Sequence, residues 1–313
     1  MRYLLPALFL ISLPGLLADD FTKRFETVKK AGDQAAIEEF LAKAATDEAE
    51  NPDYYAAAGN YWWGVAGAVA MPPIPEGDFK VDTKDLSITD PKTGKKVGSI
   101  RAAGEADPEI PKRALGILTE GAKKFPQRAD IALGLAYVQK EMGIAEGYVK
   151  TLTSLLAEAK KDPEALRWME GAEMPEAAET FLPETVQDYT AGLFNANTPA
   201  TDVLCGKLLA AVTDAFPDHP YAYNLKAALA DATGKPEEAL RMLEIAVKKA
   251  PNDALIIMNL ADAYAKAGKR DKAAENYRKI ISLDEDPQAV DKARSALKKL
   301  ESGIPLFQNC LFD

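Results

Sequence analysis

The feature of this chain that most restricts its fold is a spacing of 34 residues near its end. Pro217 and Pro251 lie 34 positions apart, and each follows a run with the apolar spacing of an amphipathic helix. When residues 220–253 are placed over 254–287, residues of the same kind coincide: Gly234 with Gly268, Ala227 with Ala261, Ala239 with Ala273, and Leu243 with Tyr277. Each block is predicted to form two helices of about 13 residues. Such a helix pair buries its apolar stripe only against neighbours, so the blocks are expected to stack in series.

The coinciding positions carry the residue types that stacked helix pairs require. Gly234 and Gly268 are expected to end the first helix of each block, because a left-handed backbone is least strained without a Cβ atom. Pro236 suits the first turn of the following helix. The alanines allow close approach of two helices, and Leu243 and Tyr277 are expected to fill the space between layers.

In these residues the chain resembles the tetratricopeptide-repeat family, whose consensus runs W-x2-L-G-x2-Y, then A-x3-F, then P. The first block supplies six matching residues: Tyr223, Ala227, Ala239, Leu243, Ala246 and Pro251. The second block supplies six more: Leu260, Ala261, Tyr264, Gly268, Ala273 and Tyr277. It departs at its end, with Ile280 for the small residue and Glu285 for the proline. The resemblance implies an all-α fold, a right-handed superhelical solenoid of helix hairpins, closed by a capping helix over residues 288–300.

The match weakens upstream, although first-helix signatures recur from Tyr55 to Trp62 and from Leu133 to Tyr137. Near the N-terminus, residues 20–30 and 33–45 are predicted to form a short helix pair interrupted by Gly32. We divide the chain into N-terminal repeat-like helices over 19–126, degenerate repeat-like helices over 127–217, two repeats with a capping helix over 218–302, and an apolar tail over 303–313. The alternative is that the N-terminal half is a different helical domain.

An insertion over residues 71–106 changes the period from helical to strand-like. It begins with three prolines between residues 72 and 75, which break a helix, and continues with alternating polar and apolar residues. A small β-hairpin or a three-stranded flap is predicted near residues 78–100. Insertions in repeats fall on loops of one face, often the binding face, but this one would serve equally as a lid over a bare helix end.

The first eighteen residues have the pattern of a secretory signal. Arg2 precedes an apolar run that ends at Ala18, after which cleavage is expected. Asp19 stands where a lipoprotein would carry its lipidated cysteine. The run is too short for a transmembrane helix, and no later segment is long and apolar enough to be one. We expect an exported protein, periplasmic or secreted, that is neither a lipoprotein nor membrane-spanning.

Export would place the two cysteines in an oxidising compartment. Cys205 falls in a predicted helix, at a position that favours a small buried side chain, and Cys310 lies in the tail. The sequence leaves open whether they are unpaired or form a disulfide.

The composition excludes several kinds of chemistry. With 38 basic against 48 acidic residues and no basic cluster, the chain lacks the cations that nucleic-acid binding requires. One histidine and two cysteines cannot supply a zinc site with four protein ligands, and no phosphate-binding or EF-hand loop is present. An acidic stretch over 162–188 is interpreted as a solvated surface, with docking of a basic partner as the alternative. We predict no catalytic residue, metal or cofactor.

In the tetratricopeptide-repeat family the first helices line a concave groove that binds an extended or helical peptide. The matched positions make seven residues our candidates for a peptide-binding groove: Tyr221, Asn224, Asp231, Leu255, Met258, Asp262 and Lys266. The lysines and asparagines with which some members clamp a terminal carboxylate are not all present, because Asn224 and Asn259 lack accompanying lysines. The alternative is that these residues are ordinary solvent-facing side chains.

A second candidate surface is an aromatic cluster that includes Tyr54, Trp62 and Trp63, although such residues are more often core. The sequence therefore favours a non-enzymatic scaffold that binds a protein or peptide. The rivals are an enzyme or carbohydrate-binding protein that uses the aromatic cluster and the flap, and a self-associating structural repeat. The apolar tail is expected to pack on the capping helix or to lie in its own or a neighbouring groove.

Overall fold

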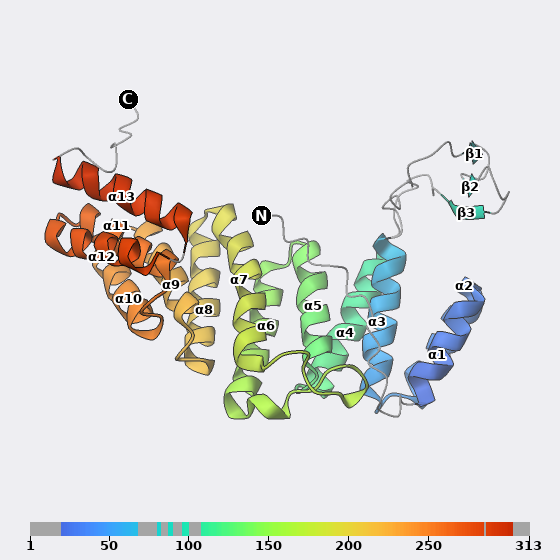
Figure 1. The fold of residues 1–313 in the computed structure, drawn as a ribbon. Helices are drawn as coiled ribbons and strands as arrows, with labels where there is room; N and C mark the ends of the chain where they lie inside the picture. The colour runs from blue at the N-terminus through green and yellow to red at the C-terminus, as the bar shows by residue number, and fades with distance from the viewer. Residues whose placement is uncertain are drawn as a thin grey trace. The chain divides into compact units, whose positions relative to one another are not determined.

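The computed structural model describes residues 20–67, 80–82, 87–89, 96–99, 108–284 and 286–302. The predicted signal peptide, most of the insertion and the apolar tail lie outside the described residues. The described part is all-α apart from three short strands (Figure 1). The chain divides into two compact units: a first unit of residues 1–138 and 167–174, and a second unit of residues 139–166 and 175–313. The boundaries that we predicted after residues 126 and 217 stay predictions.

The first unit contains the N-terminal helices. They are α1 (Asp20–Ala31), α2 (Gln34–Asp47), α3 (Pro52–Gly67), α4 (Glu109–Lys124), α5 (Ala129–Glu141, to Val138 in this unit) and the short 3₁₀ helix η2 (Met169–Gly171). The pair α1 and α2 lies where the sequence predicts it. Gly32 separates the two helices with a φ of 75°, and the Asp33 carboxylate accepts hydrogen bonds from the first amides of α2.

Three strands fall within the predicted insertion: β1 (Lys80–Asp82), β2 (Ser87–Thr89) and β3 (Lys96–Ser99). They pair antiparallel in the order β1-β2-β3, with an irregularity between Ile88 and Thr89. The residues that join the strands lie outside the described residues, so the predicted hairpin as a complete element stays a prediction.

Helices α3 and α4 approach closely because glycine stands at two of their contacts. A Cβ atom placed on Gly59 would lie 2.5 Å from the side chain of Leu118, and one placed on Gly121 would lie 2.5 Å from Cβ of Tyr55. Ala114, Leu118 and Gly121 are buried, at the spacing that Ala239, Leu243 and Ala246 have in the later repeat. The weak upstream resemblance thus coincides with a real helix contact.

This contact predicts opposite effects for two glycine substitutions in α4. Gly121→Ala is expected to destabilise the first unit by about 1–3 kcal/mol, because the new methyl group overlaps Tyr55. Gly116→Ala should instead be neutral or stabilise by up to about 1 kcal/mol, because nothing lies within 4 Å of its Cβ position and alanine favours a helix. Urea unfolding followed by tryptophan fluorescence measures both. Equal midpoints for the two variants would contradict the close packing.

The segment 167–174 belongs to the first unit because it is fastened to the start of α5. The Ala129 amide donates to the Arg167 carbonyl at 2.9 Å, and the Arg167 amide donates to the Gln127 carbonyl at 2.8 Å. Further along, the Glu170 amide donates to Oδ1 of Asp53 at 3.1 Å, from a left-handed backbone with a φ of 58°. Asp53 lies at the start of α3, so the segment joins α3 to α5.

A buried ion cluster lies at the same place. The Arg128 guanidinium makes two hydrogen bonds to Asp130, Nε to Oδ1 at 2.9 Å and Nη2 to Oδ2 at 2.8 Å. Its Nη2 atom also lies 2.6 Å from Oδ1 of Asp53. All three side chains are at most 10% exposed. Burial alone would lower the pKa of Arg128, but the Asp130 and Asp53 carboxylates outweigh it and raise that pKa.

The second unit holds the remaining helices as successive hairpins (Figure 1, green to red). They are α6 (Ala145–Lys161), the 3₁₀ helix η1 (Pro163–Ala165), α7 (Ala178–Ala196), α8 (Pro199–Ala215), α9 (Pro220–Ala232), α10 (Pro236–Lys249), α11 (Ala254–Lys266), α12 (Arg270–Leu283) and α13 (Pro287–Glu301). Gly234 and Gly268 end α9 and α11 with φ values of 76° and 71°, and Pro236 opens α10, as the sequence predicts.

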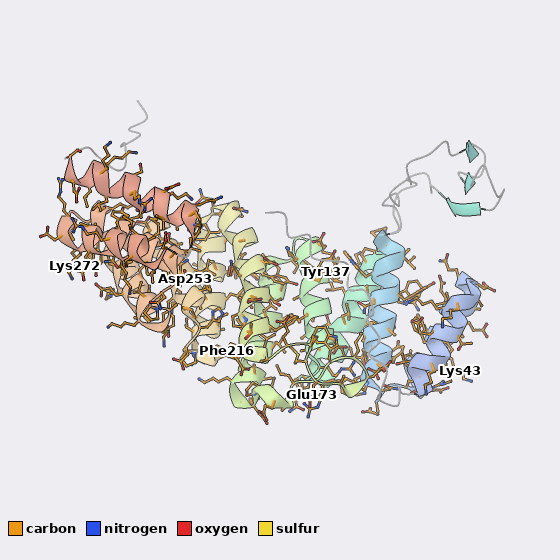
Figure 2. All side chains as sticks on the ribbon, viewed as in Figure 1. Lys43, Tyr137, Glu173, Phe216, Asp253 and Lys272 are labelled. Atoms are coloured by element: carbon orange, nitrogen blue, oxygen red, sulfur yellow. The ribbon has the colours of Figure 1, made fainter. Side chains whose placement is uncertain are left out.

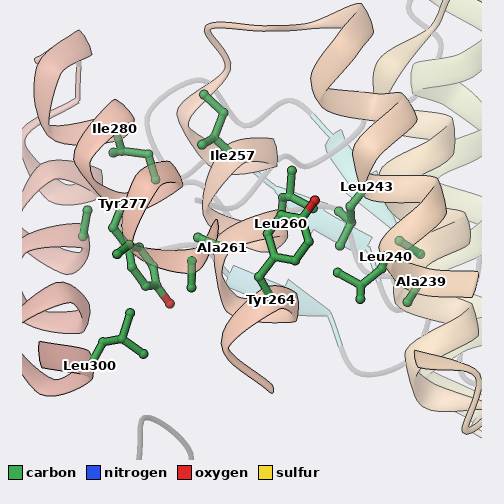
Figure 3. Packing of buried hydrophobic residues seen from close by; sticks show 14 of the residues in the cluster. Ala239, Leu240, Leu243, Ile257, Leu260, Ala261, Tyr264, Tyr277, Ile280 and Leu300 are labelled. Carbon is green, nitrogen blue, oxygen red and sulfur yellow. The ribbon is translucent and has the colours of Figure 1, made fainter. Parts of the chain in front are cut away.

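One apolar cluster runs through helices α9 to α13 (Figure 3). Ala239, Ala261 and Ala273 are buried where helices meet, and Leu243 and Tyr277 fill the space between them. Ile280 is 1% exposed, so the larger residue at this position packs against the last helices of the array. Helix α13 packs on α12, and the Arg270 guanidinium donates to the Leu300 carbonyl. The predicted capping helix is therefore present.

Candidate functional site

The first helices of successive pairs in the second unit contact one another, α7 with α9 and α9 with α11. The candidate residues on α9 and α11 therefore belong to one continuous surface, which we call the first-helix face. We define it by Tyr221, Asn224 and Asp231 of α9 together with Leu255, Met258, Asn259, Asp262 and Lys266 of α11.

Two polar pairs connect α9 to α11 across this face. Nδ2 of Asn259 donates to Oδ1 of Asn224 at 2.8 Å, and Nζ of Lys266 lies 2.8 Å from Oδ2 of Asp231. In both pairs the partners are 35 positions apart, one repeat plus one residue. The structure thus brings four polar residues of the face together as partners of each other. The asparagine pair is partly buried, whereas the side chains of Lys266 and Asp231 are 47% and 48% exposed.

A third link holds the beginning of α11. The Tyr221 hydroxyl donates to Oδ2 of Asp253 at 2.5 Å, while Oδ1 of Asp253 accepts from the Ile256 amide at 2.9 Å and so caps the helix (Figure 2 labels Asp253). The hydrogen bond to Asp253, burial and the nearby Glu184 carboxylate raise the pKa of Tyr221 to about 12. Tyr221 is therefore a neutral donor at physiological pH.

Asp262 forms a hydrogen bond with α12 instead of with α9. Its Oδ1 atom accepts a hydrogen bond of 2.6 Å from the hydroxyl of Tyr277, a fully buried residue of α12. Burial, the hydrogen bond and the Asp262 charge together raise the pKa of Tyr277. Asp262 thus joins the first-helix face to the second helix of the same repeat.

Leu255 is the apolar residue that this face exposes. It is 56% exposed at the beginning of α11, two residues after Asp253. Met258, one turn further along the helix, is partly buried against the apolar cluster. An exposed leucine beside side chains held by fixed hydrogen bonds is the arrangement expected of an anchor position at an interface.

The aromatic candidates in the first unit separate into core and surface residues. Tyr54 and Trp62 are 6% and 4% exposed, so they are core residues and are not available as surface anchors. Trp63 is half-buried and packs edge-on against Tyr137, with ring centroids 6.1 Å apart. Tyr137 is 43% exposed, whereas Tyr264, at the matching position of a later repeat, is 6% exposed (Figure 2 labels Tyr137). Trp63 is therefore the remaining candidate of the three.

The single histidine, His219, is half-buried in the turn between α8 and α9. His219 precedes α9, and its ring lies 6.0 Å from that of Tyr221. Among the described residues, no group accepts from or donates to its buried Nδ1 atom. Burial lowers the pKa of His219, and the Glu184 carboxylate opposes that effect only in part.

Cys205 is a free cysteine that is 1% exposed in α8. Burial, with a contribution from Asp202, raises its pKa to about 11, so the thiol is an inert core group. Cys310 lies outside the described residues, and the alternative of a disulfide stays open.

Two other kinds of site are absent from the described residues: a membrane-spanning helix and a cluster of metal-binding side chains. No helix there has both the length and the apolar character needed to cross a bilayer. In the same residues, no three histidine, cysteine, aspartate or glutamate side chains gather as ligands for a metal ion.

Sequence reasoning missed Asp253 and Glu184, and it did not foresee that Asn259 would complete the face. Asp253 has a recognisable signal, since an aspartate directly before an apolar helical run is a typical N-cap. Asn259 is one repeat plus one residue after Asn224, which the 34-residue period places on the neighbouring helix. Glu184 lies on α7, where the resemblance is weakest, so no such signal identifies it.

The succession of helix hairpins makes this an all-α repeat protein, apart from the three short strands. Residues 232–300 match the tetratricopeptide-repeat family. The similarity to this family therefore extends over residues 232–300, from the end of α9 into α13. No curated protein matches it significantly.

Solved structures of repeat proteins resemble the chain at low identity. One is a thermophilic tetratricopeptide-repeat protein of Thermus thermophilus, with 17% identity over 61% of this chain and 92% of that one, and a TM-score of 0.37. Another is MamA from Desulfovibrio magneticus, with 18% identity over 56% and 86%, and a TM-score of 0.36. A third is YrrB, described as a tetratricopeptide-repeat protein with an unusual peptide-binding site, with 16% identity over 60% and 84%, and a TM-score of 0.37.

Proposed function

We propose that the protein is a non-enzymatic scaffold that binds a peptide or protein segment on the first-helix face. The observation that carries this proposal is Leu255, a large apolar side chain that is 56% exposed beside a network of fixed polar side chains. An apolar anchor gains binding energy when it is buried, and prior ordering of its neighbours reduces the entropy lost on binding.

The asparagine pair is suited to the backbone of such a segment. The bond between Asn259 and Asn224 uses one amide N–H group and one amide oxygen. The Asn224 amino group and the Asn259 oxygen are not used in it, and they match the carbonyl and the N–H of a peptide. We expect the partner's backbone to bind there while one of its apolar side chains contacts Leu255 and Met258.

Two substitutions of exposed apolar residues test the proposal. Peptides selected from a random display library on the folded chain provide the ligand, and fluorescence anisotropy measures their Kd. Leu255→Ser is expected to weaken binding by about tenfold or more, as for an interface anchor. Val203→Ser is the matched control, because Val203 is 58% exposed but lies on α8, a second helix.

Failure to select any peptide would contradict the proposed function. Equal losses in the two variants would contradict the location of the site. Binding that survives Leu255→Ser but is lost in Trp63→Ala would move the site to the aromatic residues of the first unit. Glycan binding by those residues, or growth of the particle mass with concentration, would favour the two rival functions.

We also propose that the scaffold acts after export, in the periplasm or as a secreted protein. The signal-like pattern of residues 1–18 supports this proposal. Intact mass spectrometry of the protein recovered from its native host tests it. The expected mature chain begins at Asp19, and a chain that retains Arg2 would contradict export by cleavage after Ala18.

A further inference from the structure

The charges of the second unit differ between its first and second helices. The first helices α7, α9 and α11 carry five acidic residues and two lysines. The second helices α8, α10 and α12 carry seven acidic and eight basic residues. The net negative charge of this unit's helix hairpins therefore lies on its first helices, which include the two that carry the first-helix face.

Both lysines of the first helices already have a partner. Lys266 pairs with Asp231, and Nζ of Lys226 donates to the Thr213 hydroxyl on α8 at 3.3 Å. Two carboxylates near this face, those of Asp253 and Asp262, have neutral partners instead of cations. Asp253 and Asp262 accept hydrogen bonds from tyrosine hydroxyls, and a neutral donor satisfies an oxygen without cancelling its charge.

Helix α7 adds two exposed acids at the edge of this face. Glu184 and Asp188 are four residues apart and so lie on one side of the helix. Glu184 lies where α7 contacts α9, because its neighbours Pro183, Val186 and Gln187 line one small cavity with His219 and Tyr221. Within the described residues, neither Glu184 nor Asp188 forms a salt bridge with a lysine or an arginine. At the beginning of α11, the Tyr221 hydroxyl binds Asp253, which precedes exposed Leu255 by two residues.

We propose that the segment bound by the first-helix face is cationic, with an apolar anchor for Leu255 flanked by lysine or arginine residues that face Glu184, Asp188 and Asp253. This inference rests on the proposed function and specifies its partner. Charge complementarity identifies the occupant, since an anionic segment would be repelled by the negative charges of Glu184, Asp188 and Asp253.

The same argument disfavours the protein's own tail as the occupant. Residues 303–313 supply apolar side chains but contain neither lysine nor arginine, and they include Asp313. The tail can therefore offer an anchor for Leu255 without the cations that the surrounding carboxylates favour.

Three synthetic peptides of one length test the proposal on the full mature chain. Each carries a central leucine, and its flanking positions are lysine in the first peptide, glutamine in the second and glutamate in the third. The lysine peptide is expected to bind at least about tenfold more tightly than the glutamine peptide, and the glutamate peptide least. The affinity of the lysine peptide should fall as the salt concentration rises.

Two double variants with the same change in net charge locate the effect. Glu184→Gln with Asp188→Asn is expected to weaken binding of the lysine peptide several-fold and to leave the glutamine peptide unchanged. Glu237→Gln with Glu275→Gln, on the second helices α10 and α12, should change neither. Equal losses in the two double variants would show a non-specific charge effect and would overturn the proposal.

Other outcomes separate this inference from the proposed function. If the glutamine or glutamate peptide binds best and Leu255→Ser abolishes that binding, the cationic partner is wrong and the scaffold function stands. If neither these three peptides nor any library peptide binds, the scaffold function itself fails. If deletion of residues 303–313 tightens binding of all three peptides equally, the tail is the occupant and the cationic partner is overturned.

Discussion

Arg128→Met is expected to destabilise the first unit by about 3–5 kcal/mol, because it leaves two buried carboxylates without their cation. Arg128 is 5% exposed and binds Asp130 through two hydrogen bonds and Asp53 through a third contact. Asp53 also accepts the Glu170 amide, so the loss should extend to the segment 167–174. Methionine keeps most of the aliphatic volume of arginine, so the loss of stability measures mainly the removal of the positive charge.

The positions of the tryptophans make this loss measurable in one unit. All three, Trp62, Trp63 and Trp168, belong to the first unit, so the fluorescence transition in urea reports its unfolding. Arg24→Met is the control within the same unit. Arg24 is exposed and pairs with Glu48, and an exposed ion pair contributes at most about 1 kcal/mol.

A triple variant distinguishes uncompensated charge from lost packing. Adding Asp53→Asn and Asp130→Asn to Arg128→Met removes the charges that the single change leaves behind, so much of the lost stability should return. A fluorescence midpoint for Arg128→Met that equals the midpoint for Arg24→Met would contradict the buried cluster.

Tyr277→Ala is expected to destabilise the second unit by about 3–5 kcal/mol, the range for truncating a buried aromatic residue. Tyr277 is fully buried among α11, α12 and α13, and its hydroxyl satisfies Asp262. Tyr277→Phe keeps the ring and removes only the hydroxyl, so it should cost about 1–3 kcal/mol for the donor that Asp262 loses.

Far-ultraviolet circular dichroism measures this second effect, because the second unit contains no tryptophan. Tyr223→Phe is the matched control, since the Tyr223 hydroxyl makes an exposed hydrogen bond to the Pro217 carbonyl. We expect the Tyr277 variants to move the dichroism transition and to leave the fluorescence transition in place. A shift of Tyr277→Phe no larger than that of Tyr223→Phe would contradict the role of its hydroxyl.

The C-terminal repeats could be predicted because each residue type there follows from a local requirement. A glycine ends a helix in the left-handed region, an alanine stands where two helices touch, and a large residue fills the gap, as Gly268, Ala261 and Tyr277 show. These requirements recur every 34 residues, so two copies of the sequence reveal them.

The first unit was less predictable because its contacts join residues without a period. Arg128 and Asp53 are 75 positions apart, and the Glu170 amide is 117 positions from the carboxylate that it binds. Tyr137 shows that a match to the consensus does not determine which face of a helix is buried. It matches the repeat consensus, yet α5 buries Ile131, Leu135 and Val138 and leaves Tyr137 exposed.

The sequence predicted which helices carry the candidate site, but not the hydrogen bonds among its side chains. Family positions identified the residues on α9 and α11, and the structure then showed that most of the polar ones are already engaged with each other. The position of a residue in the groove does not show whether its polar groups are available to a ligand or already bonded to a neighbouring side chain. Leu255 and the acids of α7 emerge only from exposure and proximity.

The return of residues 167–174 to the first unit limits how the protein can be dissected. The backbone passes between the units at 138/139, 166/167 and 174/175, so no single cut separates them. A fragment that stops at residue 138 would lose the amide that binds Asp53 and the strand-like bridge beside Arg128. Fragments for separate study are better made by circular permutation or by replacing one unit within the full-length chain.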